Sequence, residues 1–250
     1  MAGILYLIPN TLGQTDGALG DPLTSVIPVD VQAITAKLAY FIAENAKTAR
    51  AFLKLIHVAH PLAQPLQNIN ISELNVNTPD SALPTLLAPL LAGQDAGLVS
   101  EAGVPAVADP GANLVRMAHE HGIQVRPLVG PSSLLLAVMS SGLNGQSFAF
   151  NGYLPIDVEQ RTKRIKALEL RSRQEKQTQL FIETPYRNAA LLEALSTHCQ
   201  PNTLISVATD LTLPSETIKT QSAARWKADI NAQKAPNFHK KPTVFLILAE

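Results

Sequence analysis

The sequence predicts an α/β protein of two domains, and three observations favour this fold class. Short apolar runs typical of buried strands alternate with segments of helical spacing. The composition changes near residue 150, where Gly, Asn and Pro precede a charged segment. The chain has 250 residues, 46% hydrophobic and 16% charged, enough for two modest cores and unlike a disordered chain. We therefore expect one α/β domain over 1–147 and a second over 148–250.

The expected strands of the first domain are short and continuously apolar, which indicates a mostly parallel sheet with helices on both faces. These strands cover residues 4–8, 39–43, 96–99 and 123–125. Helical spacing predicts helices at 31–38, 45–57, 81–92, 113–121 and 132–140. In the third of these, Pro84 fits a first turn, and Pro89 implies a kink or an early end. Gly122 and Gly142 follow the last two helices and end them.

The second domain is expected to hold a mixed sheet with helices. The predicted strands are 178–182, 203–208 and 243–248, with the segment 216–220 between the last two. The predicted helices are 159–173, 188–197 and 223–230. This order of elements gives a second α/β unit with its own core.

Cysteine and histidine usage argues against a metal site. The single cysteine, Cys199, excludes an intrachain disulfide framework and a cysteine-based metal site. Two histidines two residues apart on a helix, His119 and His121, diverge by about 200° and do not share a metal. Pro61 ends the helix that carries the other pair, His57 and His60. We expect no metal.

The start and the hydropathy of the chain indicate the compartment. The first residues lead directly into an apolar strand, without a secretion signal. No apolar run reaches the roughly 18 residues that would span a bilayer. We therefore expect a cytoplasmic protein with no membrane contact.

The net charge of zero hides an asymmetry between the two halves. Residues 1–150 hold six basic and ten acidic residues, a net charge of −4, and residues 151–250 hold 14 and 10, a net charge of +4. This balance excludes a uniformly basic nucleic-acid binder. The segment 161–187 alone holds eight basic and three acidic residues, a net charge of +5. Such a segment favours phosphate contacts with RNA, and the alternative is a solvated helix face.

Three loops follow predicted strands and are the candidate ligand site. They cover residues 10–14, 100–111 and 129–133. In open α/β sheets ligands bind at the carboxyl ends of the strands. Small residues in these loops allow a close backbone approach to a flat ligand. The Gly-x-Gly-x-x-Gly, Walker and Gly-x-Ser-x-Gly signatures are absent from the sequence.

Seven segments resemble, in the same order, those of one enzyme family. They are 4–8, 42–48, 96–115, 125–133, 141–143, 148–155 with Arg161, and 183–187, and the most specific is AGLVSEAGVPAVADPGANLV at 96–115. On these segments the chain resembles the tetrapyrrole methylase superfamily of S-adenosylmethionine-dependent methyltransferases. Within it, the chain is similar to the bacterial small-subunit ribosomal RNA 2′-O-ribose methyltransferases. The resemblance implies a cofactor cleft between two domains, an RNA substrate and a homodimer.

The resemblance also implies the site residues. Glu44 and Arg187 are the candidates for catalysis and substrate handling, and the alternatives are a helix-start carboxylate for Glu44 and a surface ion pair for Arg187. The candidate cofactor residues are Thr11, Ser100, Glu101, Ala102, Gly103, Val107, Ala108, Ser132, Ser133, Glu183 and Thr184. The candidate RNA-binding residues are Arg161, Lys163, Arg164, Lys166, Arg171 and Arg173.

The sequence departs from the pattern of this branch at polar positions. Glu101 replaces an Asp, Leu213 replaces a Lys, and 44–47 read Glu-Asn-Ala-Lys in place of Glu-Asp-Thr-Arg, which puts Asn45 and Lys47 at altered positions. Residues 9–14 read Pro-Asn-Thr-Leu-Gly-Gln in place of Ala-Thr-Pro-Ile-Gly-Asn. These changes leave two alternatives open beside an RNA methyltransferase. One is a small-molecule, tetrapyrrole-like methylase, and the other is a cofactor-binding module without catalysis.

Overall fold

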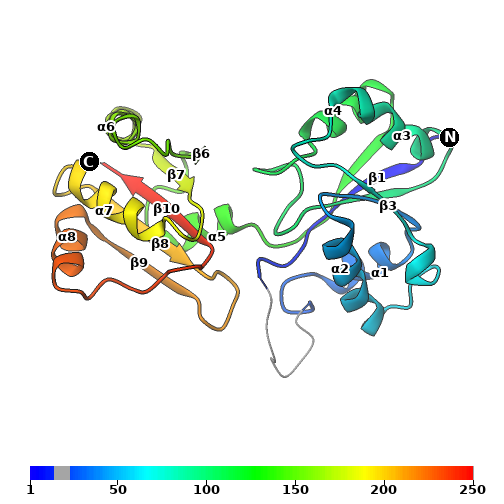
Figure 1. The fold of residues 1–250 in the computed structure, drawn as a ribbon, viewed down its shortest axis with the longest axis horizontal. Coiled ribbons are helices and arrows are strands. Elements are labelled where there is room, and N and C mark those ends of the chain that lie inside the picture. The colour runs from blue at the N-terminus through cyan, green and yellow to red at the C-terminus, as the bar shows by residue number, and fades with distance from the viewer. Residues whose placement is uncertain (14–22, 250) are drawn as a thin grey trace. The chain divides into compact units, whose positions relative to one another are not determined.

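The computed structural model describes residues 1–13 and 23–249 of the chain. It divides into two compact units, Met1–Ser132 and Ser133–Glu250. Each unit contains its own five-stranded sheet, covered by helices (Figure 1). The predicted α/β fold class is confirmed in both units.

The sheet of the first unit is entirely parallel, as the apolar runs predict. Its strands are β1 (Ile4–Ile8), β2 (Tyr40–Ala43), β3 (Asn70–Glu73), β4 (Ala96–Val99) and β5 (Gln124–Pro127), in the order β3-β2-β4-β1-β5. The sequence did not predict β3. This edge strand contains one apolar residue, Ile71, and exposes Asn70 and Glu73, so it lacks the apolar run of a central strand.

Two pairs of helices cover the two faces of this sheet. The helices are α1 (Val29–Ala36), α2 (Ala46–Ala59), α3 (Leu83–Leu91) and α4 (Ala112–Glu120), with short 3₁₀ turns η1 (Leu66–Asn68) and η2 (Asp80–Ala82). Side chains alternate between the faces along each strand. Tyr6 and Ile8 therefore pack with α1 and α2, whereas Leu5 packs with α3 and α4. Figure 1 shows the two pairs on opposite sides of β1. Pro89 lies inside α3, which ends two residues later.

The sheet of the second unit is mixed, as expected. Its strands are β6 (Phe148–Tyr153), β7 (Thr178–Ile182), β8 (Leu204–Thr209), β9 (Thr217–Ser222) and β10 (Thr243–Leu248), in the order β6-β7-β10-β8-β9. Only β6 pairs in parallel, with β7. The other neighbours are antiparallel. The sequence did not separate β6 from the composition change around residue 150.

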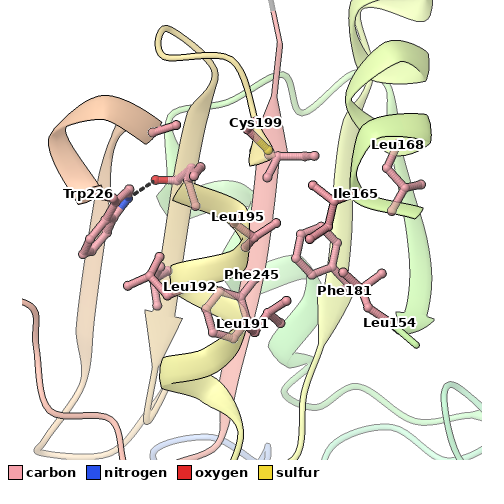
Figure 2. Close-up of a cluster of buried hydrophobic side chains, with 14 of the residues drawn as sticks. Leu154, Ile165, Leu168, Phe181, Leu191, Leu192, Leu195, Cys199, Trp226 and Phe245 are labelled. Carbon is pink, nitrogen blue, oxygen red and sulfur yellow. Dashed lines mark hydrogen bonds between the residues drawn. The ribbon is translucent and has the colours of Figure 1, made fainter. Parts of the chain in front are cut away.

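The core of the second unit lies between the sheet and three of its helices. The helices of this unit are α5 (Ser133–Ser141), α6 (Val158–Glu175), α7 (Asn188–His198) and α8 (Ala223–Asn231). Figure 2 shows Phe181 stacked on Phe245, with 6.3 Å between ring centroids. The Trp226 indole donates a 2.9 Å hydrogen bond to the Ile205 carbonyl, which satisfies its one polar group in the core. Burial and the charge of Glu169 raise the pKa of the nearby Cys199 thiol to about 12.

The division between the units falls before the expected boundary at 147–148. Helix α5 packs on strands β8, β9 and β10 and belongs to the second unit. The Thr220 hydroxyl on β9 donates a 2.7 Å hydrogen bond to the Ser141 carbonyl at the end of α5. Sequence periodicity identifies this apolar helix but does not show which sheet it covers. Within residues 1–13 and 23–249, no helix is long and apolar enough to cross a membrane.

Candidate functional site

The three candidate loops meet at the carboxyl edge of the first sheet. Asn10 and Gly103 form an isolated antiparallel bridge, with N···O distances of 2.8 and 3.2 Å. A Cβ at Gly103 would lie 3.2 Å from Leu12 and 3.5 Å from the Pro131 carbonyl. A Cβ at Gly130 would lie 2.2 Å from Pro9, so only glycine permits this approach. The predicted convergence of the loops is therefore present in the fold, except that Gln14 lies outside the described residues.

Asn10 holds the first and second loops together through its side chain. Its amide nitrogen donates to the carbonyls of Ser100 at 3.1 Å and Glu101 at 3.2 Å. Its amide oxygen accepts from the Thr11 backbone N–H at 2.8 Å. The side chain is buried, so each of these polar groups needs its partner. Sequence reasoning placed Asn10 in a candidate loop but did not identify it as a site residue.

The second loop has an unusual backbone path. Gly103, Ala106, Ala108 and Gly111 all have positive φ, with 64° at Ala106 and 62° at Ala108. An alanine in this region costs roughly 1–2 kcal/mol, and such residues cluster at binding sites. The Ser100 hydroxyl faces inward, 3.2 Å from the Ala102 carbonyl. The candidate cofactor residues Ala102, Val107 and Ala108 are exposed, and their side chains are small.

Glu44 lies at the carboxyl end of β2, beside the second loop. The register pairs Ala43 with Val99, which brings Glu44 next to the start of that loop. Burial, followed by the charges of Asp109 and Glu101, raises the pKa of Glu44 to about 7, and the Glu101 backbone amide opposes this shift. The Oε1 atom of Glu44 is buried and has no hydrogen-bond partner among the described residues. Burial and the charge of Glu101 also raise the pKa of Asp109.

The N-terminus of α2 shows that Glu44 is not a capping residue. Asn45 is the N-cap, and its side-chain oxygen accepts from the backbone amides of Lys47 at 2.8 Å and Thr48 at 3.4 Å. Asn in place of the branch's Asp therefore keeps the capping function. The Thr48 hydroxyl hydrogen-bonds to the Glu101 carboxylate, so Glu101 has a partner in the fold. Lys47, at the other altered position, is exposed.

In the second unit, Arg187 binds Glu183. Its Nη2 and Nε lie 2.5 and 3.0 Å from Glu183 Oε1, and this oxygen also accepts from the Thr184 backbone N–H at 2.6 Å. The Glu183 carboxylate is buried and the guanidinium is partly exposed. Arg187 is therefore in an ion pair whose acidic partner is buried, unlike the surface pair of the alternative interpretation, and its role in substrate handling stays a prediction. Of the two candidate serines, Ser132 ends the first unit and Ser133 begins α5.

In another altered motif, at 210–213, the acidic residue has partners nearby. The buried Asp210 carboxylate accepts from Lys241 Nζ at 2.7 Å and from the Ser215 hydroxyl at 2.7 Å. Lys241, in the segment before β10, thus balances the charge of Asp210, although Leu213 replaces the lysine that the branch has in this motif. Asn45 and Asp210 therefore have hydrogen-bond partners within these two altered motifs.

The candidate RNA-binding residues on α6 do not form one line along the helix. Arg164 and Arg171 are seven residues apart and share one flank, while Lys166 and Arg173 share a flank about 160° away. Lys163 pairs with Glu159 at 2.6 Å and Arg171 pairs with Glu175 at 3.2 Å, and both pairs are solvent-exposed. Arg161 is half-buried, and its Nη1 lies 3.4 Å from the Ile156 carbonyl.

Among residues 1–13 and 23–249, acidic and histidine side chains are not arranged as a metal site. In the part of the chain that the structure describes, no three His, Cys, Asp or Glu side chains are placed to hold one ion.

The family model of the Tetrapyrrole (Corrin/Porphyrin) Methylases matches residues 30–225. The chain belongs to this family. Two solved structures of methyltransferases share the fold of this methylase. The crystal structure of the methyltransferase CobJ has a TM-score of 0.61 at 18% identity, covering 99% of this chain and 95% of that one. Uroporphyrin-III-C-methyltransferase from Thermus thermophilus has a TM-score of 0.50 at 16% identity, covering 99% and 93%. At these identities the likeness shows the fold alone.

Curated relatives of this methylase carry the name Ribosomal RNA small subunit methyltransferase I. The protein from Xylella fastidiosa is 29% identical over 248 residues, which cover 99% of this chain and 81% of that protein. The protein from Escherichia coli O157:H7 is 30% identical over 216 residues, 86% and 68% of the two chains. The protein from Mesorhizobium japonicum is 45% identical over 112 residues, 45% and 37% of the two chains. The chain is accordingly a methyltransferase.

Proposed function

We propose that this methyltransferase uses S-adenosylmethionine to methylate a ribose 2′-hydroxyl of small-subunit ribosomal RNA. One observation carries the proposal: similarity extends over 99% of this chain to a protein named for that RNA. The converging loops of the first unit supply a ligand site at the edge where parallel sheets bind ligands.

The charges at this edge fit a cationic cofactor. S-adenosylmethionine carries a sulfonium and an ammonium group. Glu44, Glu101 and Asp109 lie close enough for their charges to raise the pKa of Glu44 and Asp109. A cation placed among them would relieve this repulsion. The small residues of the second loop would hold the flat part of the cofactor.

Methyl transfer from this cofactor requires few catalytic groups from the protein. When bound, the cofactor supplies an already activated methyl group, so the residues mainly orient the acceptor and exclude water. A ribose hydroxyl is a weak nucleophile and benefits from a base. The Glu44 carboxylate, with its pKa near 7, is suited to take the hydroxyl proton. The Arg187 guanidinium is held by Glu183, so we assign it a positioning role.

The test combines cofactor binding with product mapping. Calorimetry should show binding of S-adenosylmethionine. The enzyme with cofactor should then methylate small-subunit RNA from a strain that lacks its gene, and mass spectrometry should locate the methyl on one ribose. Methylation of a tetrapyrrole and not of this RNA would overturn the proposal in favour of a small-molecule methylase. Cofactor binding without turnover on either acceptor would favour a binding module.

We also propose that the protein acts in the cytoplasm as a homodimer. The resemblance to the superfamily supports the dimer, and a ribosomal substrate supports the compartment. Light scattering of the purified chain should give about twice the 26.8 kDa mass of one chain.

A further inference from the structure

An exposed aromatic side chain beside two basic residues lies in the second unit, at the start of α7. Tyr186 is 70% exposed. Its ring meets the His239 ring edge-on, with 5.9 Å between centroids, and Lys240 Nζ lies 5.9 Å from the ring centre. We propose that Tyr186, His239 and Lys240, the Tyr186 surface, bind one unpaired nucleotide of the RNA substrate. The base stacks on Tyr186 and its phosphate contacts Lys240. This inference rests on the proposed function.

The Tyr186 surface is held in place by the fold beneath it. The Lys240 backbone N–H donates to the Pro185 carbonyl at 3.1 Å, which ties the basic residue to the turn that carries the tyrosine. The buried Asn188 amide donates to the carbonyls of Phe238 at 3.1 Å and Lys241 at 2.8 Å. The two backbone segments that carry the aromatic and the cation are therefore fixed relative to each other before any partner arrives, which lowers the entropy cost of binding.

A cavity adjoins the tyrosine and suits a single base. Its volume is about 260 Å³, below the roughly 300–1,000 Å³ of sites for drug-sized ligands. It lies between α7, α8 and the segment before β10, and Tyr186, Ile230 and His239 are among its lining residues. Glu193 also lines it and repels phosphate, so the base rather than the backbone is expected to face the cavity.

The charges of neighbouring residues single out Lys240 for the phosphate. Arg187 is bound by Glu183, and Lys241 by Asp210. No carboxylate of the described residues lies within 4.0 Å of Lys240 or His239. Proteins bind unpaired RNA by stacking bases on aromatic rings and contacting phosphates with basic side chains. An exposed tyrosine beside an unpaired lysine offers both.

The experiment measures RNA affinity by fluorescence anisotropy with a labelled single-stranded fragment of small-subunit RNA. Tyr186→Ala should weaken binding roughly 5- to 150-fold, and Tyr186→Phe should keep it, because stacking needs only the ring. Lys240→Gln should reduce the slope of log affinity against log salt by about 0.7. The matched controls are Tyr153→Ala, at a tyrosine of β6 that is 58% exposed, and Lys227→Gln on α8. Thermal melting confirms that each variant folds.

The outcomes separate this inference from the proposed function. If Tyr186→Ala binds RNA as tightly as Tyr153→Ala does, the inference is overturned while RNA methylation by the wild-type enzyme stands. If Tyr186→Ala binds naked RNA normally but loses affinity for the whole small subunit, the surface contacts ribosomal protein and the inference is again overturned. A wild-type enzyme that neither binds nor methylates RNA overturns the proposed function and this inference together.

Discussion

Single residues decide whether the candidate loops can hold a ligand, and Asn10 is the clearest example. Its amide donates to two carbonyls of the second loop. Asn10→Asp would remove both donors and set a carboxylate against those carbonyl oxygens. We expect at least tenfold weaker S-adenosylmethionine binding by calorimetry and a loss of about 1–3 kcal/mol in unfolding free energy. Asn202→Asp, in an exposed turn, is the control. Unchanged cofactor affinity in Asn10→Asp would contradict this role.

Glu44 makes a prediction for the pH dependence of the reaction. A base with pKa about 7 in the free enzyme is increasingly ionised as pH rises, so kcat/KM for the cofactor, which reports the free enzyme, should climb through pH 7 and then level off. Glu44→Gln should lower the rate about 10²- to 10⁴-fold and remove this rise. Glu120→Gln, at an exposed position of α4, should behave like the wild type. A Glu44→Gln enzyme with the wild-type pH profile would exclude Glu44 as the base.

The Glu44 carboxyl also makes the free energy of unfolding depend on pH, and its raised pKa fixes the direction of this dependence. The pKa of Glu44 is near 4.5 in the unfolded chain and about 7 in the folded protein, so the folded protein holds this proton more tightly. Stability contributed by this group is therefore present below pH 4.5 and is lost as pH rises through about 7. Between these values Glu44→Gln should show a flatter dependence of Tm on pH than the wild type, measured by calorimetric melting. Equal slopes would mean that the wild-type carboxyl is not perturbed.

The sequence predicted which loops meet but not how they are joined. Strand ends identified the loops 10–14, 100–111 and 129–133 as neighbours because parallel strands end at one edge, and the resemblance named Thr11, Ser100 and Gly103 within them. The sequence did not predict the roles of Asn10 and Thr48. Each bonds to Glu101, which lies 91 positions from Asn10 and 53 from Thr48, and such distant hydrogen bonds leave no local pattern. The resemblance named Arg187 but did not show that Glu183 already holds its guanidinium.

Helix α6 carries the candidate RNA-binding residues, so RNA contact can be tested on its surface. Its two basic flanks lie about 160° apart, so one straight strand can follow only one of them. The flank of Arg164 and Arg171 is compared with that of Lys166 and Arg173 by changing each pair to Gln. One double variant should reduce the salt slope of RNA binding by about 1.4, and the other should change it little, with cofactor affinity unchanged in both. Equal effects on both flanks would indicate a diffuse field rather than a contact.

Central elements were more predictable than peripheral ones. The strands 4–8, 96–99, 178–182 and 243–248 were predicted with the bounds they have, because buried strands are continuously apolar. The edge strand β3 was missed, since a half-exposed edge needs no apolar run. Helix α5 was found but assigned to the other domain, because periodicity does not reveal which sheet a helix covers.

At the scale of the whole molecule, the two units have separate cores. Each of the three core clusters draws its residues from one unit. Leu195→Ala, at a fully buried site of the second unit, should cost about 2–5 kcal/mol. Hydrogen exchange should then accelerate in residues 133–249 and not in β1 or β4. Leu87→Ala should give the reverse pattern. Acceleration in both units by either variant would show that they unfold together.

The opposite charges of the two halves persist with the observed division. Residues 133–150 contain no charged side chain, so moving the boundary from 147 to 132 leaves net charges of −4 and +4 on the two units. The acidic unit carries the loops proposed for a cationic cofactor, and the basic unit carries the surfaces proposed for RNA. This division of charge follows from the sequence alone, whereas the placement of single cations on α6 required the fold.

The buried thiol of Cys199 makes this chain suited to labelling spectroscopy. It is the one cysteine in the sequence, and its pKa of about 12 leaves almost no thiolate at neutral pH. Maleimide or spin-label reagents should therefore leave the natural protein unmodified. Cysteines introduced at exposed Asn113 and Lys227 would be the sole reactive pair, one in each unit. The distance between two such labels, with and without S-adenosylmethionine, can then be recorded without first deleting a native cysteine.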